Sequence, residues 1–124
     1  MKTDAGGGGA WPWPEELDAL RAAAKTHSLV FENERVRVLE VRIGPGETAH
    51  VHTHRWQSVI YRQSGGHYIR RDGQGNVLHD TREDDAPPKT PVAVWKDRMP
   101  PHSVENVGQE EIRFFTVELK DIAG

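Results

Sequence analysis

The sequence contains no cysteine among its 124 residues. Disulfide bonds, zinc-thiolate sites and thiol nucleophiles are therefore excluded together, and any bound metal must use nitrogen and oxygen ligands. No apolar run approaches the ~20 residues that a membrane span requires, and residues 1–10 lack the apolar segment of a secretory signal. These absences predict a cytoplasmic protein without membrane contacts.

Charge of one sign is not concentrated anywhere in the chain. The sequence has 16 Lys and Arg against 19 Asp and Glu, which gives a formal net charge of -3. No block of basic residues is dense enough to follow a phosphate backbone. We therefore expect no nucleic-acid partner, and a small molecule is the remaining class of ligand or substrate.

The length is that of one domain, with a compositional change near the N-terminus. Residues 1–14 are Gly-rich and end in Trp-Pro-Trp-Pro, which predicts a flexible arm ahead of a single domain over residues 15–124. Trp11 and Trp13 are expected to cover an apolar patch of this or a neighbouring subunit, or to form a lid over a ligand. Residues 15–25 contain good helix formers, with acids first and bases last, and predict one helix.

Short β-rich runs follow, separated by Gly, Pro and Asn. Each run places β-branched or aromatic residues at alternating positions, which is typical of half-buried strands. The expected strands are residues 29–33, 35–43, 47–54, 58–63, 67–71, 76–82, 91–97, 102–107 and 111–119. Short strands with regular breaks predict an all-β fold, an antiparallel sandwich or small barrel.

Three of the seven histidines lie in one of these runs, at positions 50, 52 and 54. Alternate side chains of a strand point to the same face, so His50, His52 and His54 are expected to point the same way. Imidazole is the commonest protein ligand for metals, and two on one rigid strand can share an ion. The pattern favours a metal site; the alternative is a solvated edge strand whose histidines only decorate a polar face.

A second stretch, residues 97–106, places His102 after two prolines and four residues before Asn106. Alone, His102 is more typical of a structural residue. Together with the first stretch, it completes a resemblance to the single-domain cupins. The first motif of that family begins with a Gly, five residues and His-x-His. Three residues, a Glu, six residues and a second Gly complete it. Gly46, His52, His54 and Gly65 match it.

The alternative register, with Gly44, His50 and His52, fits only the first half of that motif. The second cupin motif ends in His, three residues, Asn, which His102 and Asn106 match. The resemblance covers about residues 29–120. It implies an all-β cupin jelly-roll (double-stranded β-helix) barrel with one short N-terminal helix.

The sequence departs from the family at the usual carboxylate ligand, which falls on Ser58. A serine hydroxyl is a poor ligand for a divalent ion, so His52, His54 and His102 remain as the expected ligands. Three neutral imidazoles leave a divalent ion an open position, as in catalytic sites. The expected cofactor is one divalent metal ion, either iron, zinc, nickel or manganese.

Further residues are candidates for the pocket or for positions behind the ligands. His50 is the candidate catalytic group, as a proton carrier at the barrel mouth, or else a solvated histidine. Gln57 would reach the ion only if the strand bulges, because strand parity points it outward. Trp56 is expected either as a pocket wall or as core packing, and Asn106 as a partner of the nearby backbone.

Similar three-histidine cupins include dioxygenases acting on small thiols and diketones, so the resemblance implies a dioxygenase-like enzyme. The alternative is a non-catalytic cupin that binds or senses a small molecule. Small bacterial cupins with the segments HTHRW and PPHSVENVG are named for β-alanine degradation. Cupins of this size also imply a homodimer, whose partner the Trp-Pro arm could reach.

Overall fold

The computed structural model describes residues 11–121, which form nine strands and three short helical segments. No helix within this range is long and apolar enough to cross a membrane. In chain order the elements are η1 (Glu15–Leu17), α1 (Ala19–Ala22), β1 (His27–Glu32), β2 (Val36–Ile43), β3 (Thr48–His54), β4 (Gln57–Ser64), β5 (Tyr68–Asp72), β6 (Val77–Asp80), η2 (Thr81–Glu83), β7 (Val92–Lys96), β8 (Met99–Asn106) and β9 (Ile112–Leu119).

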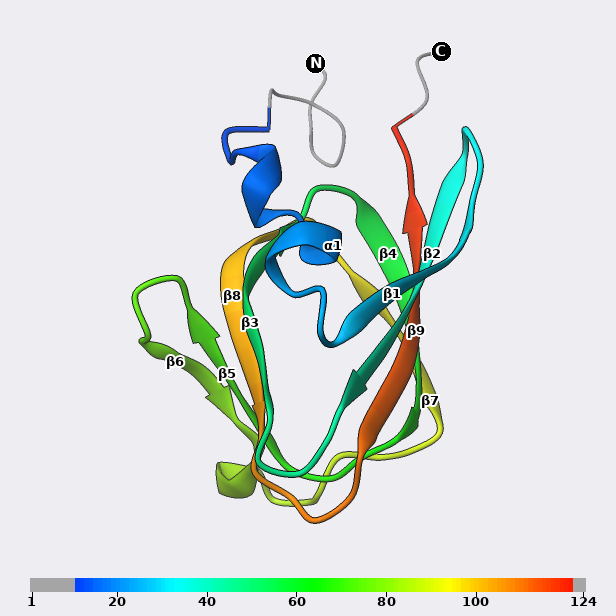
Figure 1. The fold of residues 1–124 in the computed structure, drawn as a ribbon. Coiled ribbons are helices and arrows are strands. Elements are labelled where there is room, and N and C mark those ends of the chain that lie inside the picture. Colours follow the sequence, from blue (N-terminus) through cyan, green and yellow to red (C-terminus); the bar gives the residue numbers. More distant parts are fainter. Residues whose placement is uncertain (1–10, 122–124) are drawn as a thin grey trace.

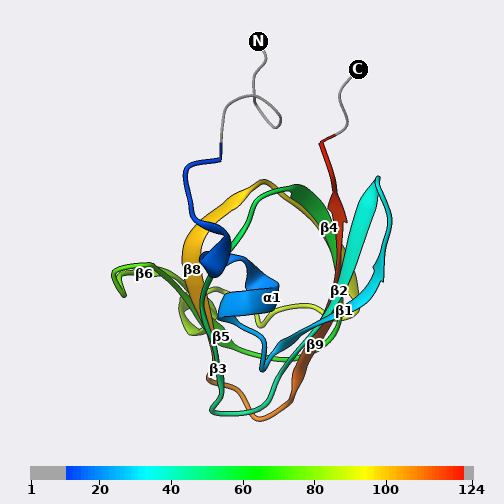
Figure 2. The same ribbon diagram turned by 45° about the horizontal axis from the view of Figure 1, so that its top comes forward.

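Two antiparallel sheets face each other and enclose the interior of a barrel. One has the strand order β1-β2-β9-β4-β7 and the other the order β3-β8-β5-β6. Consecutive strands such as β2 and β3 lie in different sheets, so the chain crosses repeatedly between them. The segment containing α1 lies across one end of the barrel (Figures 1 and 2). The prediction of an all-β barrel with a short N-terminal helix is confirmed.

Alternating residues of the larger sheet build the interior. Val41 and Ile43 of β2 are fully buried and pack with Ile112 of β9 and Ala49 of β3. The neighbouring loop comes close to the same cluster at Gly65, whose φ is +124°. A Cβ there would lie 2.9 Å from the Ile112 Cα, so this position requires glycine.

The predicted helix over residues 15–25 is wrong in its extent, because the chain breaks at Asp18. Asp18 has an extended ψ of 143° and separates η1 from α1. Its carboxylate accepts a hydrogen bond from the Leu20 amide at 3.1 Å and so caps α1. The same carboxylate accepts two bonds from the Arg37 guanidinium, at 2.9 and 3.0 Å. A continuous helix would remove the cap, and the ion pair with β2 holds Asp18 in place.

We expect Asp18→Ala to lower the free energy of unfolding by about 2–4 kcal/mol, because α1 loses its cap and a buried guanidinium loses one of its carboxylates. Glu16→Ala is the control, since Glu16 is exposed and has no described hydrogen bond. Urea denaturation measures both. Equal stability of the two variants would show that Asp18 does not anchor the segment.

Candidate metal centre

Four histidines from three strands meet inside the barrel. His52 and His54 belong to β3, His102 to β8 and His27 to the first position of β1. The His52 ring centre lies 4.6 Å from that of His27, 4.9 Å from that of His54 and 4.4 Å from that of His102. The His54 ring centre lies 5.6 Å from that of His27 and 5.7 Å from that of His102. Their side chains form one cluster, which we call the histidine cluster.

The pairing of strands explains this meeting. His52 stands opposite His102 in the β3–β8 ladder, and both residues are buried. His27 stands opposite Val41 at the start of β1, directly after the turn that follows α1. Its backbone amide bonds to the Ala23 carbonyl at 3.0 Å, which fixes the entry into the strand. One potential ligand atom from each of His27, His52 and His54 lies within 4.8 Å of the others.

Each ring of the histidine cluster has an oxygen beside its Nδ1. For His52 it is the His50 carbonyl at 2.6 Å, and for His102 the Pro100 carbonyl at 2.8 Å. Carbonyl oxygens only accept hydrogen bonds, so both Nδ1 atoms carry the proton. The neutral rings therefore present the lone pair of Nε2.

The other two rings have side-chain oxygens beside Nδ1. The Thr26 hydroxyl oxygen lies 3.0 Å from His27 Nδ1 and 3.2 Å from the Ala23 carbonyl, so it accepts from the ring when its own proton is donated to Ala23. His54 Nδ1 donates to the Glu118 carboxylate at 2.7 Å. Among the bonds of residues 11–121, none uses an Nε2 atom of the cluster. Histidines that bind metals typically donate their other ring N–H in this way.

Glu118 connects the cluster to the N-terminal segment. Its carboxylate is completely buried and accepts from His54 with one oxygen and from Arg37 Nε, at 2.5 Å, with the other. Arg37 continues to Asp18. Burial alone would lower the pKa of Arg37, but its bonds to Asp18 and Glu118 raise it. The chain of contacts holds the His54 ring at a fixed angle.

Burial favours the neutral form of three of these rings. It lowers the pKa of His27 to about 3 and that of His102 to about 4, with repulsion from His54 as the next cause. The pKa of His52 falls well below its usual value for the same two reasons. Protons therefore do not compete for the Nε2 lone pairs of these rings near neutral pH.

The cluster borders a cavity of about 260 Å³ between the sheets. Apolar side chains of both sheets form most of its wall, among them Ile60, Val94 and Phe114. The four histidines lie in the same wall. A small molecule in this cavity would therefore contact the imidazoles directly.

His52, His54 and His102, the ligands expected from the sequence, lie in one cluster with ring centres 4.4, 4.9 and 5.7 Å apart, although the three-histidine group within 4.8 Å contains His27 in place of His102. His50 lies elsewhere. His50 is exposed and gives the cluster only its carbonyl. The expectation that it shares the face of His52 is wrong, because the β3–β8 pairing is irregular between Ala49 and His52. The extra residue reverses the alternation, as a bulge does.

The remaining candidates lie around the cluster rather than against the cavity. The Gln57 amide points outward and donates to Asp97 at 3.2 Å. Ser58 is buried on the inward face of β4, beside Glu118 in the pairing, and its hydroxyl has no hydrogen-bond partner among the described residues. Asn106 bonds to the backbone carbonyls of Ile43 and Glu110, as expected.

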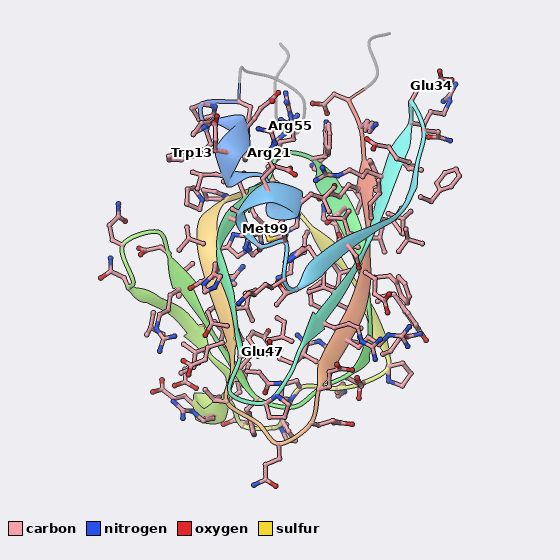
Figure 3. The ribbon with its side chains drawn as sticks, viewed as in Figure 1. Trp13, Arg21, Glu34, Glu47, Arg55 and Met99 are labelled. Carbon is pink, nitrogen blue, oxygen red and sulfur yellow. The ribbon has the colours of Figure 1, made fainter. Side chains whose placement is uncertain are left out.

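Trp56 lies outside the cavity. The Arg37 guanidinium carbon is 5.1 Å from its ring centre, and the ring lines a second hollow of about 290 Å³ together with Trp11 and Trp13. Figure 3 shows Trp13 and Arg55 at the end of the barrel that carries the N-terminal segment. Residues 1–10 of the predicted arm lie outside the described residues. The flexibility of the arm therefore stays a prediction.

Sequence reasoning missed His27 and Glu118. His27 starts a strand whose other residues are exposed, so no alternation marks its inward face. Glu118 lies in a strand that was predicted, but nothing local indicates a partner 64 positions away. The one available signal is parity, since Ile112, Thr116 and Glu118 share the buried face of β9.

Comparisons with known proteins identify the fold. No family model matches the chain, and no curated protein matches its sequence. A cupin domain protein from Bordetella pertussis has a similar structure, with a TM-score of 0.63 and 23% identity over 77% of this chain and 92% of that one. A double-stranded β-helix protein from Klebsiella pneumoniae gives 0.56 and 23%, over 79% and 78%.

The polyketide cyclase RemF from Streptomyces resistomycificus has a TM-score of 0.51 and 19% identity, over 77% of this chain and 64% of that one. At these identities the likeness concerns the fold. The relation to proteins named for β-alanine degradation and the cytoplasmic location stay predictions. The chain has the double-stranded β-helix fold of the cupins, with a buried group of histidines that could hold a metal ion.

Proposed function

We propose that this cupin binds one divalent metal ion at the histidine cluster and acts on a small organic molecule in the adjoining cavity. The observation that carries the proposal is that each Nδ1 of the cluster lies beside an oxygen, while no described hydrogen bond uses an Nε2 atom of these rings. His52, His54 and His102 are the ligands expected from the sequence, and His27 is a further one. The donor set fits iron, zinc, nickel or manganese.

The bound ion would supply Lewis-acid chemistry or, if it is iron, dioxygenase-like chemistry. The protein's own contribution is to hold the four rings, exclude bulk water and position the substrate. Glu118 fixes the His54 ring and is itself held by Arg37, so its carboxylate is not free to act as a base. RemF, which shares the fold, is named as a polyketide cyclase, so the fold accommodates an enzyme.

A non-catalytic binding cupin is the second candidate. No Asp or Glu occurs among the described residues that line the cavity, so none of these residues supplies a carboxylate as a general base. Metal-loaded protein incubated with small thiols, diketones and amino-acid derivatives distinguishes the two. The first candidate predicts consumption of one of them that stops without metal, and saturable binding without product would favour the second.

Metal binding itself is tested by two substitutions two residues apart on β3. Wild type and His50→Gln should bind about one equivalent of zinc, because only the carbonyl of His50 serves the cluster. His52→Gln should lose at least tenfold in affinity, since a ligand is removed. Competition with a chromogenic chelator gives the affinities. Equal zinc binding by His52→Gln and wild type would refute the assignment.

The lowered pKa values of His27, His52 and His102 predict how the metal-free protein responds to acid. Because the folded pKa values of His27, His52 and His102 lie below that of free histidine, the unfolded chain binds more protons below about pH 6.5. Stability should fall as the pH drops from 7 to 5, with a slope of up to about 1.4 kcal/mol per unit for each histidine.

Thermal denaturation in the presence of a chelator measures this loss. His102→Gln should show a shallower dependence on pH than wild type, while His50→Gln should follow the wild type. A melting temperature that does not change between pH 7 and pH 5 would mean that the three rings are not buried as neutral groups.

We also propose that the chain forms a homodimer through the outer face of the larger sheet. Neighbouring positions on five strands make an apolar stripe there: Phe31, Val38, Val117, Val59 and Trp95. Phe31 and Trp95 are each 53% exposed. Contiguous exposed apolar surface of this kind is typical of interaction sites, and a second copy is the partner that the cupin resemblance implies.

Light scattering should give a dimer mass for the wild type at micromolar concentration and a monomer mass for Trp95→Lys, which places a charge at the β7 end of the apolar stripe. Val77→Lys is the control, because Val77 is equally exposed but lies on β6 of the other sheet. A monomeric wild type, or a dimeric Trp95→Lys, would rule out this interface.

A further inference from the structure

The cavity beside the histidine cluster carries charge of one sign. Four of its lining residues are formally cationic, and none of its described lining residues is acidic: Arg62, Arg70, Lys89 and Lys96. The chain as a whole has more acidic than basic residues, 19 against 16. Chance would therefore place at least as many acids as bases in the wall. The presence of basic residues and the absence of acidic ones in the described wall indicate that the cavity favours a negatively charged group.

Three of these cations converge from different strands. Arg62 lies on the inward face of β4 and Lys96 on that of β7, opposite Ser58. Arg70 comes from β5 in the facing sheet, opposite Val104, which is two residues from His102. The three cations lie close enough to repel one another: burial and then repulsion from Arg70 and Arg62 lower the pKa of Lys96. We call Arg62, Arg70 and Lys96 the cationic wall.

No carboxylate in the described part of the chain neutralises this wall. Within residues 11–121, none of the ion pairs involves Arg62, Arg70 or Lys96. Arg62 Nη1 is buried without a hydrogen-bond partner, while its guanidinium carbon lies 4.7 Å from the Tyr68 ring centre. An unpaired buried donor on a cation is costly, and an anionic ligand would satisfy it.

We propose that the cavity binds small organic carboxylates, whose carboxylate is held by the cationic wall and whose apolar body lies against the surrounding side chains. A guanidinium presents paired donors that match a carboxylate. Ile60, Val94 and Phe114 line the same cavity and offer apolar contact to the rest of the molecule. The volume of about 260 Å³ limits this body to a small hydrocarbon or single ring.

This inference rests on the proposed function in one respect, because it names the class of substrate that would reach the histidine cluster. The cationic wall itself does not require a metal. Binding can therefore be measured with metal-free protein, and the two proposals can fail separately. A protein that binds acids but no metal would refute only the metal site, and the converse result would refute only this inference.

The experiment titrates metal-free protein with benzoate and hexanoate and, as uncharged matches, with benzamide and hexanamide, followed by NMR of the isoleucine methyl groups. We expect the acids to bind at least tenfold more tightly than the amides, with the largest shifts at Ile60, Ile43 and Ile112, which line the cavity. Equal binding of acids and amides would overturn the proposal, as would inorganic phosphate binding as tightly as benzoate.

Arg62→Gln and Arg70→Gln should each weaken benzoate binding at least fivefold and leave benzamide unchanged. Arg35→Gln is the matched control, because Arg35 is exposed and does not line the cavity. Circular dichroism and thermal denaturation verify that the variants are folded, and if one is not, the other decides. Wild-type affinity for benzoate in both folded variants would overturn the assignment of the cationic wall.

Discussion

The hydrogen bonds at Nδ1 of the histidine cluster are the constraint on which the rest of the interior depends. In two rings the acceptor is a backbone carbonyl of the same strand, so the strand itself sets the ring angle. In His54 it is Glu118, a buried carboxylate that needs Arg37 to compensate its charge. Arg37 in turn needs Asp18, which ends one helical segment and caps the next. The break between η1 and α1 at Asp18 is therefore connected to the orientation of the buried His54 ring through Arg37 and Glu118.

The cavity combines two features that would be unfavourable if they stayed unpaired. At one side, His27, His52 and His54 offer potential ligand atoms within 4.8 Å of one another, and no described hydrogen bond uses an Nε2 atom of the cluster. At the other, Arg62 and its neighbours present cations with no carboxylate. A cation at the first and an anion at the second would satisfy both, and a metal ion with an organic acid supplies that pair. Binding of either component should favour the other, because opposite charges would lie in one buried space.

Much of this arrangement could be predicted from the sequence, since strand alternation and motif spacing are local properties. They predicted the nine strands, and they selected His52 and His102, which stand opposite each other in the β3–β8 ladder. The prediction that His50 points the same way as His52 was wrong, because an irregularity in the β3–β8 pairing reverses the alternation of side chains along β3. His27 and Glu118 could not be found because their roles depend on which distant strands become neighbours. The cationic wall has the same origin: its members come from three strands, and nothing local distinguishes an inward arginine from an exposed one.

The central claim is that the rings of the histidine cluster carry their proton on Nδ1 and leave Nε2 free for a metal ion. Long-range proton–nitrogen NMR of the histidine rings tests it most directly, with metal-free protein at pH 7 and each signal assigned by a His→Gln substitution. The account predicts the Nδ1–H tautomer for His27, His52, His54 and His102, and a change at their Nε2 atoms when zinc is added. Nε2–H tautomers or charged rings in the cluster, unaffected by zinc, would contradict it.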